Sequence, residues 1–100
     1  MPRTFAPSKK DTTQPAIEAA FKRAGWSVCD VHAVGLNAPD LFAAKHSITI
    51  AVECKSNGLK PSPIQAAWAR EWKGRYLTGD DPALLLLQAE AVLELYDDRE

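Results

Sequence analysis

The sequence predicts a mixed α/β domain, and three observations lead to this fold class. Apolar residues recur at helical spacing near the N-terminus, alternate with polar residues over residues 47–55, and run without interruption over residues 83–87. In order, the expected elements are a helix, three strands, a helix, a strand and a short closing helix. This order favours a mixed sheet of about four strands flanked by helices.

The N-terminal part of the chain is expected to hold an arm, a helix and two short strands. Residues 1–12 carry two prolines and the pair Lys9-Lys10, so we expect a flexible arm before a domain at 13–100. Thr13 can cap a helix that has Pro15 in its first turn and ends at Gly25. The next segments are a strand, a loop rich in Gly, Asn and Pro, a second strand and a turn, expected at residues 26–31, 35–39, 41–44 and 45–46.

The clearest strand runs from Ser47 to Lys55. Its apolar residues occupy every second position, and they are Ile48, Ile50, Val52 and Cys54. Side chains two apart on a strand share a face, so Glu53 and Lys55 point the same way, opposite the apolar row. Cys54 is therefore expected to pack in the core and not to act as a nucleophile.

The C-terminal part is expected to hold two helices and one strand. Ser62 can cap a helix that starts near Pro63, carries Trp68 and Trp72 on one face, and stops at Gly74. Because residues 83–87 are apolar throughout, they are interpreted as a buried strand after a turn at residues 80–82. Residues 89–97 are expected to form the closing helix.

Composition and charge limit the class of protein. Apolar residues are 46% of the chain and charged residues 25%, which is typical of a soluble globular domain. No apolar run approaches the ~20 residues that a membrane-spanning helix needs. The two cysteines have no zinc-site spacing, so we expect reduced thiols in the cytoplasm. The net charge of -1 argues mildly against a nucleic-acid partner, but carboxylates that hold a metal would lower this sum.

Asp40, Glu53 and Lys55 form a candidate catalytic group. A hairpin turning at residues 45–46 would place Asp40 opposite Ala51 and diagonal to Glu53, within ~7–8 Å on one face. Two carboxylates this close repel each other unless a cation lies between them, and such a pair suits Mg²⁺ or Mn²⁺. The backbone carbonyl of Cys54 could add a ligand, and Lys55 could orient the attacking water and stabilise negative charge. These parts are the ones that hydrolytic cleavage of a phosphodiester requires.

The spacing of these residues resembles a known signature. Pro39-Asp40, followed after twelve residues by Glu53-Cys54-Lys55, resembles the P-D…(D/E)-x-K motif of the restriction-endonuclease-like superfamily, whose core has the same element order. The following stretch looks like the virus-type replication-repair nuclease branch (VRR-NUC), through Lys55-Ser56, Leu59, Ser62, Gln65 and Trp68. That branch also carries a Glu on its first helix, which Glu18 matches. The resemblance covers residues 14–97.

The resemblance implies a metal-dependent DNA endonuclease that cuts branched substrates such as four-way junctions. It implies a homodimer, often of viral origin, so the expected location is the cytoplasm of a bacterial or phage-infected cell. One active site per domain leads to the same expectation, because cutting two strands needs a symmetric pair of chains. Gln65 would orient Lys55, Glu53 or a phosphate, and Glu18 could reach the metal through a water.

Simpler interpretations remain beside these. Glu53 and Lys55 could form a surface ion pair, Glu18 could pair with Lys22, and Gln65 could make only a helix-start hydrogen bond.

Trp68 and Trp72 suit a core or a dimer seam better than base stacking, and His32 and His46 lack ligand spacing. The candidate phosphate contacts could equally be solvated surface, and they are Lys60, Arg70, Lys73 and Arg75 with Lys9 and Lys10 of the arm. The alternative functions are a non-catalytic nucleic-acid-binding module of the same fold and an unrelated interaction domain.

Overall fold

The computed structural model describes residues 13–34, 38–55 and 62–97. The expected arm, part of the 35–39 loop and residues 56–61, which precede the second helix, lie outside the described residues. Three helices and four strands follow one another in the predicted order. They are α1 (Thr13–Arg23), β1 (Ser27–Asp30), β2 (Leu41–Lys45), β3 (Ile48–Cys54), α2 (Pro63–Glu71), β4 (Arg75–Gly79) and α3 (Pro82–Asp97), with a short 3-10 turn, η2 (His32–Val34), between β1 and β2.

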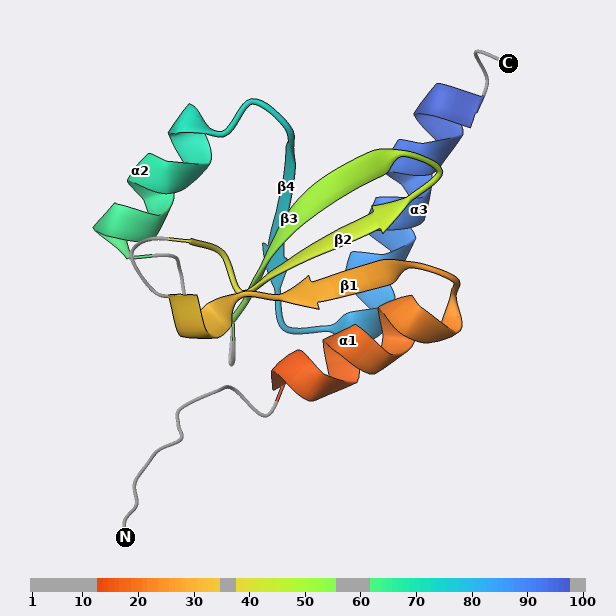
Figure 1. Cartoon of the computed structure of the whole chain (residues 1–100), viewed down its shortest axis with the longest axis horizontal. Helices are drawn as coiled ribbons and strands as arrows, with labels where there is room; N and C mark the ends of the chain where they lie inside the picture. Colours follow the sequence, from red (N-terminus) through yellow and green to blue (C-terminus); the bar gives the residue numbers. More distant parts are fainter. Residues whose placement is uncertain (1–12, 35–37, 56–61, 98–100) are drawn as a thin grey trace, which may run out of the picture.

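The four strands form one mixed sheet in the order β1-β2-β3-β4. The first two pairings are antiparallel, and β3 pairs with β4 in parallel. A parallel pair needs a crossover connection, and α2 provides it. Figure 1 shows α2 on one side of the sheet and α1 and α3 on the other. The architecture is therefore a three-layer α/β domain with a four-stranded mixed sheet between helices, as predicted.

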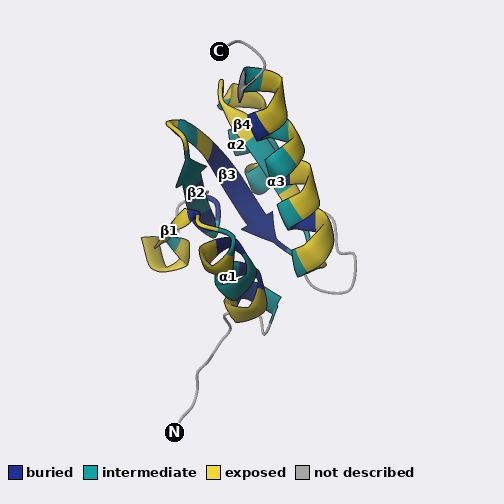
Figure 2. Cartoon of the chain, turned by 90° about the vertical axis from the view of Figure 1, so that its right-hand side faces the viewer, coloured by how far each residue is buried: buried dark blue, intermediate teal, exposed yellow. Residues whose placement is uncertain are grey.

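The main core lies between the sheet and the pair α1 and α3. Its side chains come from one face of β2 and β3 and from both helices, and they include Ile17, Phe21, Leu41, Ile50, Val52, Cys54, Leu85, Ala89 and Leu93. Strand β3 is buried along most of its length, which Figure 2 shows as a dark blue arrow. Its alternation is the predicted one, with Cys54 in the core and Glu53 on the opposite face, toward α2.

The prediction of a strand at residues 83–87 is wrong, because these residues begin α3. The carboxylate of Asp81 accepts hydrogen bonds from the backbone N–H groups of Ala83 (3.0 Å) and Leu84 (3.3 Å), which caps the helix. Leu85 is 1% exposed, whereas Leu87 is 67% exposed, as expected for a helix with one face outward. The separate helix at 89–97 is the continuation of α3. The fourth strand is instead β4, which precedes this helix.

The hairpin between β2 and β3 turns one residue later than predicted. His46 and Ser47 form the turn with φ angles of 52° and 69°, and Leu41 pairs with Val52. Continuing this ladder by one residue puts Asp40 opposite Glu53, and not opposite Ala51. Moving the turn by one residue changes every cross-strand partner by two residues. Because side chains two apart on a strand share a face, Asp40 and Glu53 keep the shared face that the sequence predicts.

None of the helices in residues 13–34, 38–55 and 62–97 has the length and apolar character that crossing a membrane requires.

Candidate active site

Asp40 and Glu53 face each other at one end of the sheet, under the start of α2. Asp40 follows the fully buried Pro39 and immediately precedes β2, while Glu53 is the second-last residue of β3. Oδ2 of Asp40 accepts a hydrogen bond from the backbone N–H of Cys54 at 2.7 Å. This bond extends the ladder between the two strands by one step, and it fixes the Asp40 carboxylate beside Glu53.

Gln65 joins the start of α2 to Glu53. Its Oε1 accepts a hydrogen bond from the backbone N–H of Ser62 at 2.9 Å, and the Ser62 hydroxyl accepts from the backbone N–H of Gln65 at 3.2 Å. This reciprocal pair is a capping box. Because Oε1 is committed to Ser62, the amide Nε2 points at Glu53 and donates to its Oε2 at 2.7 Å. Gln65 thus makes both the helix-start bond and the orienting contact that the sequence left as alternatives.

Lys55 lies on the same face as Glu53, as strand alternation predicts. Its Nζ is 3.9 Å from Oε2 of Glu53, and its backbone N–H donates to the carbonyl of Gly79 on β4 at 2.8 Å. The Lys55 side chain is 18% exposed and that of Glu53 only 4%. The ion pair is therefore not the solvated surface pair of the simpler interpretation.

Burial and charge strongly perturb the ionisation of Glu53. Its pKa is raised from an ordinary 4.5 to about 7, chiefly by loss of hydration and next by the negative charge of Asp40. The positive charge of Lys55 opposes this shift, and a hydrogen bond to Asp40 adds to it. At neutral pH Glu53 therefore carries a proton for part of the time, and a cation bound beside it would favour its ionised form.

The donor set fits a hard divalent cation. Mg²⁺ and Mn²⁺ are held by one or two carboxylates, and water and phosphate oxygens complete their coordination. Asp40 and Glu53 are such a pair, and the backbone of Cys54, which follows Glu53, contacts the Asp40 carboxylate through its N–H. Within the described residues, no group of three or more His, Cys, Asp or Glu side chains gathers at one point. A contribution of Glu18 through a water stays a prediction. On α1 its carboxylate accepts from the Nε2 of Gln14 at 3.0 Å.

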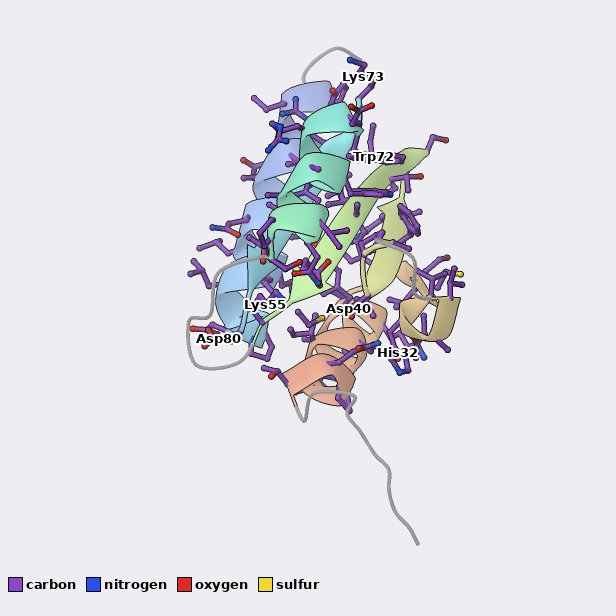
Figure 3. The ribbon with its side chains drawn as sticks, turned by 90° about the vertical axis from the view of Figure 1, so that its left-hand side faces the viewer. His32, Asp40, Lys55, Trp72, Lys73 and Asp80 are labelled. Carbon is purple, nitrogen blue, oxygen red and sulfur yellow. The ribbon has the colours of Figure 1, made fainter. Side chains whose placement is uncertain are left out.

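The basic residues that were predicted to contact phosphates do not all lie near Asp40 and Glu53. Figure 3 shows Lys55 and Asp40 near one end of α2, and Lys73 beyond the other end. Arg70 and Lys73 are exposed. Lys9, Lys10 and Lys60 lie outside the described residues. His32 pairs with Asp30 through Nδ1 at 3.0 Å, and His46 is a turn residue, so neither histidine joins the site in the described chain.

An aromatic cluster fills the space between α2 and the sheet beside the acids. Trp68 and Trp72 stack with ring centres 5.2 Å apart, and Phe42 of β2 packs against Trp72 at 5.6 Å. Tyr76 of β4 lies 6.3 Å from Trp68. Both tryptophans are half-buried, so these contacts agree with a packing role between α2 and the sheet, and the alternative of a dimer seam stays a prediction.

Sequence reasoning missed Tyr76, because residues 75–79 carried no strand prediction. Its hydroxyl is buried and has no hydrogen-bond partner among the described residues. Burial raises the pKa of Tyr76 to about 12, and the charges of Glu53 and Asp40 contribute to this increase. The phenol therefore keeps its proton and lies within the electric field of the two acids.

A scan against protein-family models finds no match for this chain, and a search of curated proteins finds none either. The architecture is consistent with a restriction-endonuclease-like core, since a helix, an antiparallel three-stranded meander, a crossover helix and a parallel fourth strand follow in that order. The resemblance to the VRR-NUC branch stays a prediction.

Proposed function

We propose that this chain is a divalent-metal-dependent endonuclease that hydrolyses DNA phosphodiester bonds. The observation that supports this most is the acid pair: the half-buried Asp40 faces the buried Glu53, with Gln65 and Lys55 both directed at Oε2 of Glu53. A buried carboxylate that is costly to ionise has a chemical reason to be there if it helps to hold a cation.

In this proposal each residue has a separate task. Asp40, Glu53 and the Cys54 carbonyl hold a Mg²⁺ or Mn²⁺ ion, which when bound lowers the pKa of water and offsets charge on the phosphate. Gln65 fixes the rotamer of Glu53 through its amide. Lys55 supplies a positive charge that orients the attacking water and stabilises the negative charge that develops on the phosphoryl oxygens.

The proposed substrate is branched DNA such as a four-way junction, and the proposed active form is a homodimer in a bacterial or phage-infected cell. The resemblance to the VRR-NUC branch supports the substrate class. The dimer is supported by the one candidate active site that the described residues form and by the need to cut two strands. No base-reading motif is present in the sequence, so recognition of shape is the expected mode.

The test is cleavage of an end-labelled four-way junction in Mn²⁺ and in EDTA. We expect cleavage in Mn²⁺ only, and a loss of at least about 100-fold with Asp40→Asn or Lys55→Met, because each removes a charge that acts on the reacting phosphate. Glu94→Gln is the matched control, since Glu94 is an exposed acid of α3. Cleavage that persists in EDTA, or in both variants, contradicts the mechanism. Salt-sensitive DNA binding without turnover in any metal would support the non-catalytic binding module instead.

A further inference from the structure

The hydroxyl of Tyr76 is the feature of the candidate active site that the contacts above leave without a role. In the described part of the chain it is the one buried side-chain polar atom that has no hydrogen-bond partner. A buried polar group without a partner is unfavourable and uncommon in native proteins, so such a group calls for a partner that binds in another state of the molecule.

The register of the sheet places Tyr76 on the same face as Glu53, and the charge of Glu53 contributes to the raised pKa of the phenol. Tyr76 pairs with Ala51 and Thr78 pairs with Glu53, so Tyr76 shares a face with Glu53 and is its diagonal neighbour across β3 and β4. An aromatic side chain can span the distance between diagonal neighbours in a sheet. Trp68 of α2 contacts the ring with ring centres 6.3 Å apart, and the hydroxyl oxygen itself is buried.

The chemistry of the two groups is complementary. The phenol stays protonated because burial and the nearby acids raise its pKa to about 12, so toward a carboxylate it can only donate. An ionised carboxylate has about four lone-pair directions. Gln65 and Lys55 are both directed at Oε2, which leaves Glu53 with capacity for a further donor.

We propose that Tyr76 is a positioning residue of the candidate active site, whose hydroxyl donates a hydrogen bond to the ionised Glu53 carboxylate when that carboxylate holds a divalent cation. The inference rests on the proposed function, because it assigns a partner of the metal-holding acid. Groups that orient a metal ligand in this way typically change metal affinity by 10- to 100-fold when they are removed.

The experiment compares Tyr76→Phe with Tyr96→Phe by calorimetric titration with Mn²⁺, thermal unfolding without the ion, and junction cleavage. Tyr96→Phe is the matched control, because its hydroxyl accepts from Arg75 at 3.4 Å on α3, away from the acids. We expect Tyr76→Phe to weaken Mn²⁺ binding by about 10-fold or more and to lower kcat with little change in KM. The melting temperature without the ion should stay the same or rise, since the substitution removes only a hydroxyl without a partner.

A residue with a purely structural role would give the opposite pattern. Equal Mn²⁺ affinity of Tyr76→Phe and wild type overturns the inference, and a lower melting temperature with unchanged affinity would show that the hydroxyl holds a structural water. If wild type binds Mn²⁺ and cuts DNA while Tyr76→Phe behaves identically, only this inference fails. If wild type neither binds Mn²⁺ nor cuts, the proposed function fails as well.

Discussion

At the scale of single residues, the candidate site places a carboxylate where burial disfavours its charge. Glu53 is 3% exposed and faces a second acid, and both factors raise its pKa to about 7. Gln65 and Lys55 compensate part of this cost through Oε2. Such an arrangement lowers the free energy of unfolding of the metal-free protein, and it creates a site where a cation can bind.

The pH dependence of stability follows from this pKa. Below about pH 4.5 Glu53 is protonated in both the folded and the unfolded state, so its ionisation does not change the free energy of unfolding. Between about 4.5 and 7 the unfolded chain releases the proton while the folded chain keeps it, and stability falls as pH rises. Without divalent ions, Glu53→Gln should therefore be more stable than wild type at pH 8, by on the order of 3 kcal/mol.

Urea denaturation in EDTA at several pH values measures this difference. The gap between Glu53→Gln and wild type should close as the pH approaches 4.5, and Mn²⁺ should raise the stability of wild type at pH 8 but not that of the variant. A gap that does not change with pH would mean that Glu53 has the same pKa in the folded and the unfolded protein, and it would contradict the raised pKa.

At the scale of elements, the start of α2 both caps a helix and positions an acid. The capping box of Ser62 and Gln65 is a local feature that the sequence predicts in part, through Ser62 and Pro63. The reach of the Gln65 amide to Glu53 depends on how α2 packs over the end of β3, which no local pattern encodes. One side chain therefore links the crossover helix to the candidate site.

Two substitutions separate these tasks. Gln65→Glu keeps an acceptor for the Ser62 N–H, and a Glu suits this position of a capping box, but it replaces the donor to Glu53 with a negative charge. We expect junction cleavage to fall by about 10- to 100-fold while helix stability is retained. Ser62→Ala should give the reverse, a loss of about 1 kcal/mol of stability with a much smaller change in cleavage.

Thermal unfolding and single-turnover cleavage of both variants check this prediction. Equal losses of cleavage in Gln65→Glu and Ser62→Ala would show that Gln65 acts only through the helix, and not through its contact with Glu53.

At the scale of the whole molecule, α3 presents an apolar face that the described chain leaves exposed. Its inward face carries the buried Leu85, Ala89 and Leu93, while Leu84, Leu87 and Leu95 are 50%, 67% and 60% exposed. Figure 2 shows exposed residues along the outer side of α3. A second apolar surface lies on α2, lined by Pro63, Ile64, Ala67, Trp68, Glu71 and Trp72. Exposed apolar surface of this kind is typical of interfaces, which is compatible with the proposed homodimer.

The α3 face gives the dimer proposal a direct test. Leu87→Glu combined with Leu95→Glu should shift the protein from dimer to monomer in sedimentation velocity, because each places a charge in a face that a two-fold axis brings together. Ser27→Glu is the control, since Ser27 is an exposed polar residue of β1 and adds the same charge outside α3. Wild-type protein that sediments as a monomer at the concentrations used for cleavage would contradict the dimer. A double variant that remains dimeric would assign the interface to the α2 surface instead.

The sequence by itself determined the first helix, the first three strands, the crossover helix α2 and the shared face of Asp40, Glu53 and Lys55. These features are local, because alternation along a strand fixes which side chains share a face, and a shift of two residues in the hairpin leaves that face unchanged. Only the tertiary structure decided that residues 83–87 are helical, that Tyr76 belongs to the site, and that Glu53 is buried deeply enough to raise its pKa. A continuous apolar run has no period of its own, so its conformation depends on the partners that it packs against, and the same holds for the burial of an acid.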